Sequence, residues 1–73
     1  AFVTLEVYNV KGQKVKTLIN KDMHQGFYTA AWNGTDENNT AVTSGLYFGK
    51  CVIESDENNS DKYTSTKKML LLK

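Results

Sequence analysis

Short runs of alternating apolar and polar residues, separated by turn-forming residues, constrain this chain more than any other feature. In residues 2–8, Val3, Leu5 and Val7 share one face and polar side chains share the other, which is typical of a half-buried strand. Such runs recur roughly every ten residues. No segment has a helical period, and proline is absent. The sequence therefore predicts an all-β fold, a β-sandwich of about five to seven strands.

Four further runs predict strands at residues 14–19, 27–32, 45–54 and 62–72. The lysines of the first favour an edge strand, with Val15, Thr17 and Ile19 on one face and Lys14, Lys16 and Leu18 on the other. The third is apolar on both faces, which favours a central strand. In the last, one face is expected to hold Tyr63, Ser65, Lys67, Met69 and Leu71. The polar stretch 21–26 is expected to cross between two sheets.

Turn-forming residues fill the centre of the stretch 32–48, while its ends are aromatic. Asn33-Gly34 is a strong turn dipeptide, and Asn39 suits the left-handed conformation in which glycine is most common. We expect a strand, a long ordered connection and another strand here. The structural core is predicted to include Trp32, Tyr47, Gly45 and Val7.

The composition indicates one small domain over residues 1–73. With 40% hydrophobic residues, a chain of this size buries only roughly 60% of its unfolded surface. Nine lysines, no arginine and a net charge of +1 give no reason to expect nucleic acid as a partner. One cysteine forms no internal disulfide. No apolar run approaches the ~20 residues that span a bilayer, so we expect no membrane span.

The candidates for catalysis are few, and the sequence predicts a protein that is not an enzyme. His24 is the only histidine, so a Ser-His-Asp triad needs it, yet it lies in a polar loop. Cys51 lies in an apolar run, where a free cysteine is more often core filler than nucleophile.

Two acidic loops and one aromatic residue leave ligand binding open. The loops around Asp36 and Asp56 carry oxygen ligands suited to weak calcium binding, but neither has the alternating spacing of an EF-hand, so turn capping is favoured and no cofactor is expected. A carbohydrate platform needs exposed aromatic rings, whereas Trp32 is expected in the core.

Four segments match known motifs in order and spacing. They are VYNVKGQKVKTL at 7–18, GFY at 26–28 with WNGTDEN at 32–38, VTSGLYF at 42–48, and KKMLLLK at 67–73. The first three resemble motifs of the FlgD-type immunoglobulin-like domain. The last resembles the ending of C-terminal sorting domains of the type IX secretion system in Bacteroidota. The resemblance implies an immunoglobulin-like sandwich.

The resemblance also implies a function. A sorting module is a noncatalytic C-terminal part of a secreted or cell-surface bacterial protein, and a translocon component or a sortase recognises it. Its recognition residues here are expected to be Lys67, Lys68, Met69, Leu71 and Lys73. Two alternatives remain: a structural spacer packed on an adjacent domain of an extracellular enzyme, and an assembly domain of the hook-capping type.

The chain departs from the family pattern in two places. Asn39 stands where the family usually has glycine. Strands that usually precede the segment beginning at Phe2 are not found in this sequence, so the sandwich is expected to lack N-terminal strands. An open edge or groove near residues 2–8 then predicts weak self-association.

Overall fold

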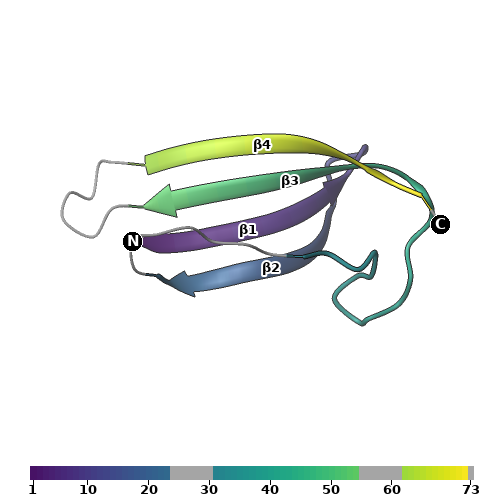
Figure 1. Cartoon of the computed structure of the whole chain (residues 1–73), viewed down its shortest axis with the longest axis horizontal. Helices are drawn as coiled ribbons and strands as arrows, with labels where there is room; N and C mark the ends of the chain where they lie inside the picture. The colour runs from purple at the N-terminus through teal and green to yellow at the C-terminus, as the bar shows by residue number, and fades with distance from the viewer. Residues whose placement is uncertain (24–30, 55–61, 73) are drawn as a thin grey trace.

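A computed structural model describes residues 1–23, 31–54 and 62–72. The strands are β1 (Phe2–Asn9), β2 (Lys14–Asp22), β3 (Gly45–Glu54) and β4 (Lys62–Leu71). They form one antiparallel sheet in the order β2-β1-β3-β4 (Figure 1). The all-β prediction is confirmed, and this sheet is a fragment of an immunoglobulin-like fold.

A tight turn joins β1 to β2 and is organised by Asn9. The Asn9 side-chain Oδ1 accepts hydrogen bonds from the backbone N–H groups of Lys11 and Gln13, both at 3.0 Å. Gly12 has φ +80°, the left-handed region that glycine enters without a steric penalty. The turn thereby closes the hairpin and sets the pairing of the two strands.

The pairing of β2 with β1 is interrupted twice. The register shifts between Leu5 and Glu6 and again between Val7 and Tyr8, so that Leu18 and Val15 are the additional residues on β2. A bulge of this kind breaks the alternation of side chains between faces. The predicted strict alternation of β2 is therefore wrong, and Leu18 lies over the same face as Leu5 and Val7.

The core of the described residues lies on one face of the two central strands. Val3 and Val7 on β1 are 2% and 0% exposed, and Tyr47 on β3 is 6% exposed. β3 pairs with β1 through Val7 and Gly49, and Gly49 pairs in turn with Lys67 of β4. The predicted central position of β3 and edge position of β2 are confirmed.

Three expectations about the strands are corrected. Lys21 and Asp22 belong to β2 instead of a crossing loop. Ala31 and Trp32 are not in a strand, while the rest of the predicted strand 27–32 lies outside the described residues. β1 is paired on both sides, so the open edge predicted at residues 2–8 is wrong, whereas the predicted alternative, a groove, matches an apolar pocket lined by Leu5 and Val7. β2, which continues to Asp22, occupies that edge.

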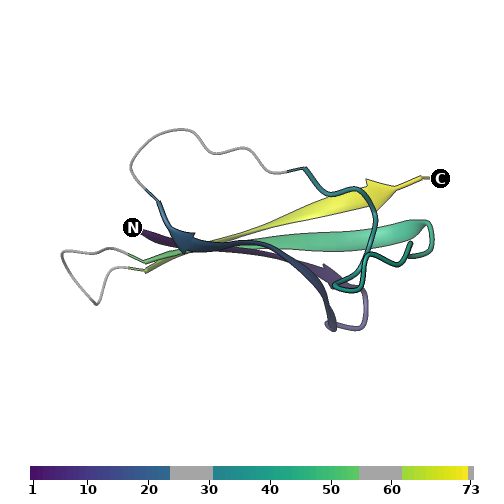
Figure 2. The same cartoon turned by 90° about the horizontal axis from the view of Figure 1, so that it is seen from below.

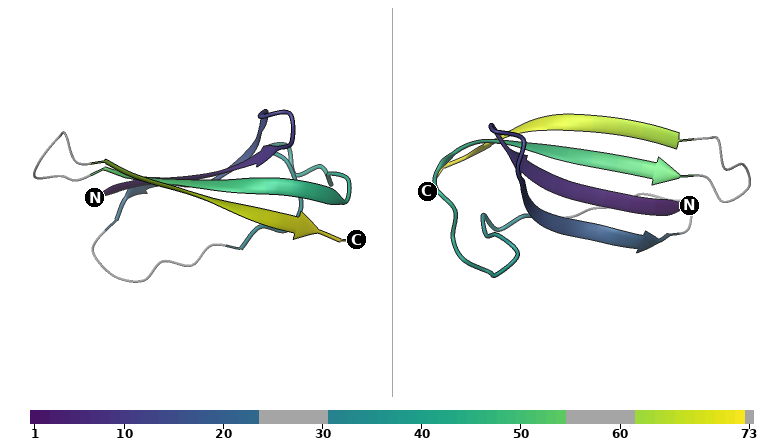
Figure 3. Two further views of the ribbon diagram at one scale, coloured as in Figure 1. Left: turned by 90° about the horizontal axis from the view of Figure 1, so that it is seen from above. Right: turned by 180° about the vertical axis from the view of Figure 1, so that it is seen from behind.

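The connection 31–44 leads to β3 and is visible off one face of the sheet in Figures 2 and 3. An isolated bridge pairs Thr35 with Ala41, and the backbone N–H of Val42 donates to the Gly34 carbonyl at 2.9 Å. Asn39 has φ +61°, so its predicted left-handed conformation is confirmed. These contacts make the connection an ordered loop.

Candidate interaction surface

The outer edge of β4 is the candidate site. β4 pairs with β3 along its whole length, from Lys62 opposite Glu54 to Leu71 opposite Gly45. On its other side no strand pairs with it among the described residues (Figure 1). An edge strand of this kind presents a row of backbone N–H and C=O groups to which another strand can add.

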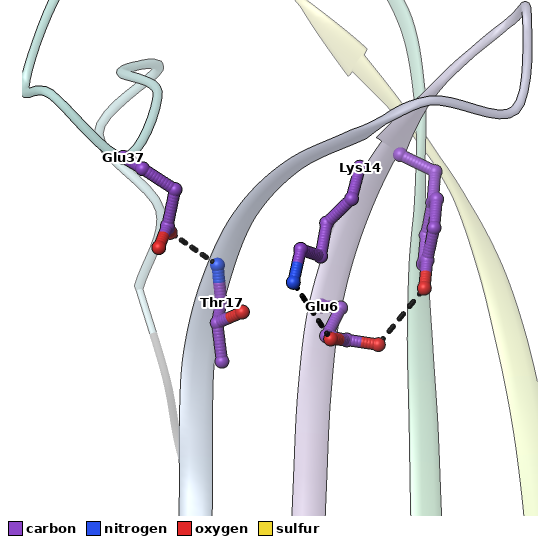
Figure 4. Close-up of polar contacts among 5 residues, drawn as sticks. Glu6, Lys14, Thr17 and Glu37 are labelled. Carbon is purple, nitrogen blue, oxygen red and sulfur yellow. Dashed lines mark hydrogen bonds and ion pairs between the residues drawn. The ribbon is translucent and has the colours of Figure 1, made fainter.

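The opposite edge of the sheet, on β2, is covered by the chain itself. The backbone N–H of Thr17 donates to a carboxylate oxygen of Glu37 at 2.6 Å (Figure 4). Next to it, the Lys16 ammonium donates to the Thr35 hydroxyl at 2.9 Å and to Asn39 Oδ1 at 3.2 Å. The connection 31–44 therefore supplies partners to the middle of β2, which hinders the addition of another strand there.

The loop that carries Glu37 is held by Asp36. Its Oδ1 accepts hydrogen bonds from the backbone N–H groups of Asn38 at 2.9 Å and Thr40 at 3.0 Å. The Asp36 N–H also donates to the Thr40 carbonyl at 2.9 Å. The carboxylate thus caps the turn, which is the role that the sequence favoured for this loop. In the described ranges, no cluster of three or more histidine, cysteine or acidic residues is placed to hold a metal ion.

The charged side chains of β4 are all positive. The strand carries Lys62, Lys67 and Lys68 and no acidic residue. Lys62 approaches Glu54 of β3 at 3.9 Å. No ion pair within the part of the chain that the structure describes involves Lys67 or Lys68, and both side chains are exposed. The half of β4 nearer Leu71 therefore presents positive charge that no described acidic residue balances.

An apolar pocket of about 230 Å³ lies beside Lys67 on the core face of the sheet. It is lined by Leu5, Val7, Leu18, Trp32, Gly49, Cys51, Ser65, Lys67 and Met69. Gly49 leaves room for Met69, whose Cε lies 3.4 Å from where a Cβ would stand. Lys67 and Met69 thus connect the edge of β4 to the apolar face.

The other face of the sheet carries a small polar cluster. The Tyr8 hydroxyl donates to Glu6 Oε1 at 2.8 Å, and the Lys14 ammonium lies 3.6 Å from Glu6 Oε2 (Figure 4). The hydrogen bond to the carboxylate raises the pKa of Tyr8, with smaller contributions from burial and from the negative charge of Glu6. This cluster joins β1 to the start of β2.

The predicted recognition residues lie together along the end of β4. Lys67 and Lys68 are exposed, and Met69 and Leu71 are half-buried. Adjacent residues of a strand point to opposite faces, so Lys67, Met69 and Leu71 share the core face and Lys68 lies on the other. Lys73 lies outside the described residues.

The predicted core residues differ in how deeply they are buried. Val7 and Tyr47 are buried, whereas Trp32 is half-buried against the Tyr47 ring. Gly45 is the first residue of β3 and is half-buried opposite Leu71.

The side chains weighed for other chemistry do not assemble into a site among the described residues. Cys51 is a half-buried free thiol that lines the apolar pocket. His24 and Asp56 lie outside the described residues. In the described ranges, no helix is long and apolar enough to span a membrane.

Sequence reasoning did not find the contact between Thr17 and Glu37. The two residues are 20 positions apart, and the donor is a backbone group whose identity no side chain reveals. The only signal was the left-handed Asn39, which indicated an ordered loop without indicating what it covers. The sequence placed the recognition residues on the last strand, but it did not indicate that this strand has an open edge.

Comparison with known proteins gives one match. The family model described as FlgD Ig-like domain matches residues 1–56. The matched residues include β1, β2 and β3 and end before β4. No curated protein and no solved structure matches the chain.

Proposed function

Because the chain belongs to the FlgD Ig-like domain family, we propose that it is a noncatalytic accessory module that directs a larger bacterial protein through secretion and sorting. In this proposal the parent protein is secreted or carried on the cell surface, and the module lies at its C-terminal end. A translocon component or sortase of the type IX secretion system recognises β4.

One observation carries the proposal: β4 combines an unpaired edge with lysines that have no counter-ion in the described part of the chain. The pairing of β4 with β3 requires no particular charge at Lys67 and Lys68, since both side chains are exposed. Many polar residues would satisfy the sheet at these positions. Positive charge beside an open edge instead suits a partner that binds by strand addition and by charge.

The mechanism needs only binding, and no bond is made or broken by the module. Met69 and Leu71 are half-buried on the core face, so they hold the end of β4 against the sheet where it pairs with β3. Lys67 and Lys68 then stand on the two faces of one strand, at a spacing that the strand sets. A partner recognises a folded module in this way and passes over an unfolded chain, whose lysines have no fixed spacing.

A second candidate is a structural spacer that packs on an adjacent domain of the parent protein. The apolar pocket lined by Val7, Trp32 and Met69 favours it, because an apolar surface on one face of a sheet is stabilised by burial. In this case the contact is made by the face of the sheet, and the lysines of β4 only keep the edge solvated. An assembly domain of the hook-capping type is a third candidate from the same family.

Export of a reporter tests the proposal. The chain is fused to the C-terminus of a periplasmic reporter in a host with type IX secretion, and surface exposure is measured. Wild type should carry the reporter to the surface, whereas deleting residues 68–73 should leave it in the periplasm. Changing Lys67, Lys68 and Lys73 to Gln with Met69 and Leu71 intact should have the same effect. A folded wild-type fusion that stays in the periplasm would contradict the sorting function.

A matched control separates recognition from net charge. Changing Lys11, Lys14 and Lys21 to Gln removes three charges from β2 and the turn before it, and should leave export unchanged. A further check is the gene of the parent protein: a domain encoded after Lys73 would favour the spacer.

A further inference from the structure

The two edges of the sheet differ in whether the chain covers them. At β2, the Glu37 carboxylate accepts a hydrogen bond from the backbone N–H of Thr17, and the Lys16 ammonium donates to the same loop. At β4, no comparable contact exists among the described residues. Strand addition is therefore hindered on one side of the sheet and unhindered on the other.

The free edge also has a defined chemistry along its length. Lys67 and Lys68 are adjacent and stand on opposite faces, and residues 69–71 continue the strand as Met, Leu and Leu. Lys67 lines the apolar pocket, where no described acidic residue balances its charge. A strand laid along this edge meets two positive charges and then an apolar stretch.

We infer that the outer edge of β4 binds an extended peptide segment of a partner protein, one that is acidic opposite Lys67 and Lys68 and apolar opposite residues 69–71. This inference rests on the proposed function and names the chemistry of the partner. The segment adds to the sheet as a further strand beside β4.

Backbone and side chains have separate roles in this contact. Main-chain hydrogen bonds to the edge of β4 supply affinity for any extended peptide, because they do not depend on sequence. Directly opposed side chains lie about 4.5–5.5 Å apart between Cβ atoms, close enough for a carboxylate to pair with Lys67 or Lys68. Moving the segment by one residue exchanges its two faces and separates apolar side chains from Met69 and Leu71. The charges and the apolar side chains together therefore set the register.

A second copy of this chain fits the edge less well than an acidic segment. Two β4 strands bring together three lysines from each copy and no acidic residue. Antiparallel pairing centred on Lys67 or on Lys68 places like charges directly opposite each other, which is destabilising. The charge complementarity of the edge thus favours a carboxylate-bearing partner.

Peptide binding to the 73-residue chain tests the inference. The probe is a fluorescein-labelled peptide with the length of β4, 10 residues, with Glu opposite Lys67 and Lys68, Val opposite residues 69–71 and Thr elsewhere. It is made in antiparallel and parallel orders. Comparison peptides carry Lys in place of Glu or the same residues scrambled. Fluorescence anisotropy should show saturable binding of one acidic order, weakened by added salt.

Charge reversal provides the specific variant. Lys67→Glu with Lys68→Glu should weaken binding of the acidic peptide by about tenfold or more and should create binding of the Lys peptide. The matched control, Lys11→Glu with Lys21→Glu on β2 and the turn before it, makes the same change in net charge at exposed lysines and should bind like wild type. Circular dichroism verifies that each variant is folded. Newly gained binding of the Lys peptide cannot result from unfolding of the variant.

Hydrogen exchange locates the added strand. Bound peptide should slow exchange at outward-facing amides of β4 and leave those of β2 unchanged. Equal binding of the scrambled peptide, an equal effect of the β2 control, or protection elsewhere would overturn the inference. So would concentration-dependent self-association through β4 without peptide binding, since a second copy would then be the occupant.

The peptide and export experiments fail independently. If the acidic peptide does not bind but the reporter is exported, the partner chemistry is wrong and the sorting function stands. If the peptide binds at β4 but the intact fusion is not exported, the edge is a binding site and the sorting function is wrong.

Discussion

The indole ring of Trp32 meets the phenol ring of Tyr47 edge to face, with ring centroids 4.9 Å apart and planes inclined by 65°. Trp32 lies in the connection 31–44, and Tyr47 lies in β3. The polar atoms of both rings bond within that connection: the indole N–H donates to the Thr35 carbonyl and the Tyr47 hydroxyl to the Thr43 carbonyl, each at 2.8 Å. One aromatic pair thus fixes the connection against the sheet.

Truncating this pair should be costly. Trp32→Ala is expected to lower the free energy of unfolding by about 3 kcal/mol, the lower end of the range for buried aromatic rings, because Trp32 is only half-buried. Urea denaturation followed by circular dichroism measures this. Trp32→Phe keeps a ring and loses the N–H donor, and should cost about 1 kcal/mol from the hydrogen bond. Near wild-type stability of the alanine variant would mean that the ring contributes little to the core and would revive the sugar-binding hypothesis.

Removing the Glu37 carboxylate should expose the edge of β2. In Glu37→Ala, we expect the Thr17 amide to exchange its hydrogen several-fold faster, up to about tenfold, corresponding to loss of about 1 kcal/mol. Hydrogen exchange measured by NMR resolves this single amide. Glu54→Ala, on the exposed end of β3, is the matched control and should leave Thr17 unchanged. An unchanged Thr17 amide in the Glu37 variant would show that the connection does not protect this edge.

Stability should fall at alkaline pH through Tyr8. Its pKa is raised in the folded protein, chiefly by the hydrogen bond to Glu6, so the folded state holds the phenol proton more tightly than the unfolded state. This contribution is fully present below the ordinary tyrosine pKa of about 10 and is lost as the pH rises through the higher folded value. Ultraviolet titration of tyrosinate should detect the late-titrating group. Glu6→Gln should bring that titration toward the ordinary value, and Tyr8→Phe should remove it.

Filling the space at Gly49 should stabilise the protein. A Cβ at this position lies 3.4 Å from Met69 Cε, the mobile end of a flexible side chain, and the backbone is not in the left-handed region. Gly49→Ala should therefore raise the free energy of unfolding by about 0.4–1 kcal/mol through lower entropy of the unfolded chain. Thermal and urea unfolding measure the change. Gly49→Val, which forces Met69 to move, should lose this gain; a destabilised alanine variant would show that Met69 cannot adjust.

Much of the sheet follows from local residue patterns. Strand positions were predictable because side chains alternate with period two in β1, and because the apolar run of β3 and the lysines of β2 indicate central and edge positions. Gly34 and Asn39 marked the turns of the connection 31–44 for an equally local reason, the low steric cost of left-handed backbone for these residues. For the candidate site, the sequence placed Lys67, Lys68, Met69 and Leu71 on one strand.

The tertiary structure alone decided which edge of the sheet is covered and which is free among the described residues. The bulges at Val15 and Leu18 depend on pairing between strands, which changes the face of a residue without changing its sequence context. The cover over β2 depends on a carboxylate meeting a backbone N–H from 20 positions away. The sequence by itself determined that this protein is built of β-strands and that its last strand is basic, because these properties are local. Which edge is covered among the described residues depends on where the long connection lies, because contacts between distant residues are set by the packing of the whole chain.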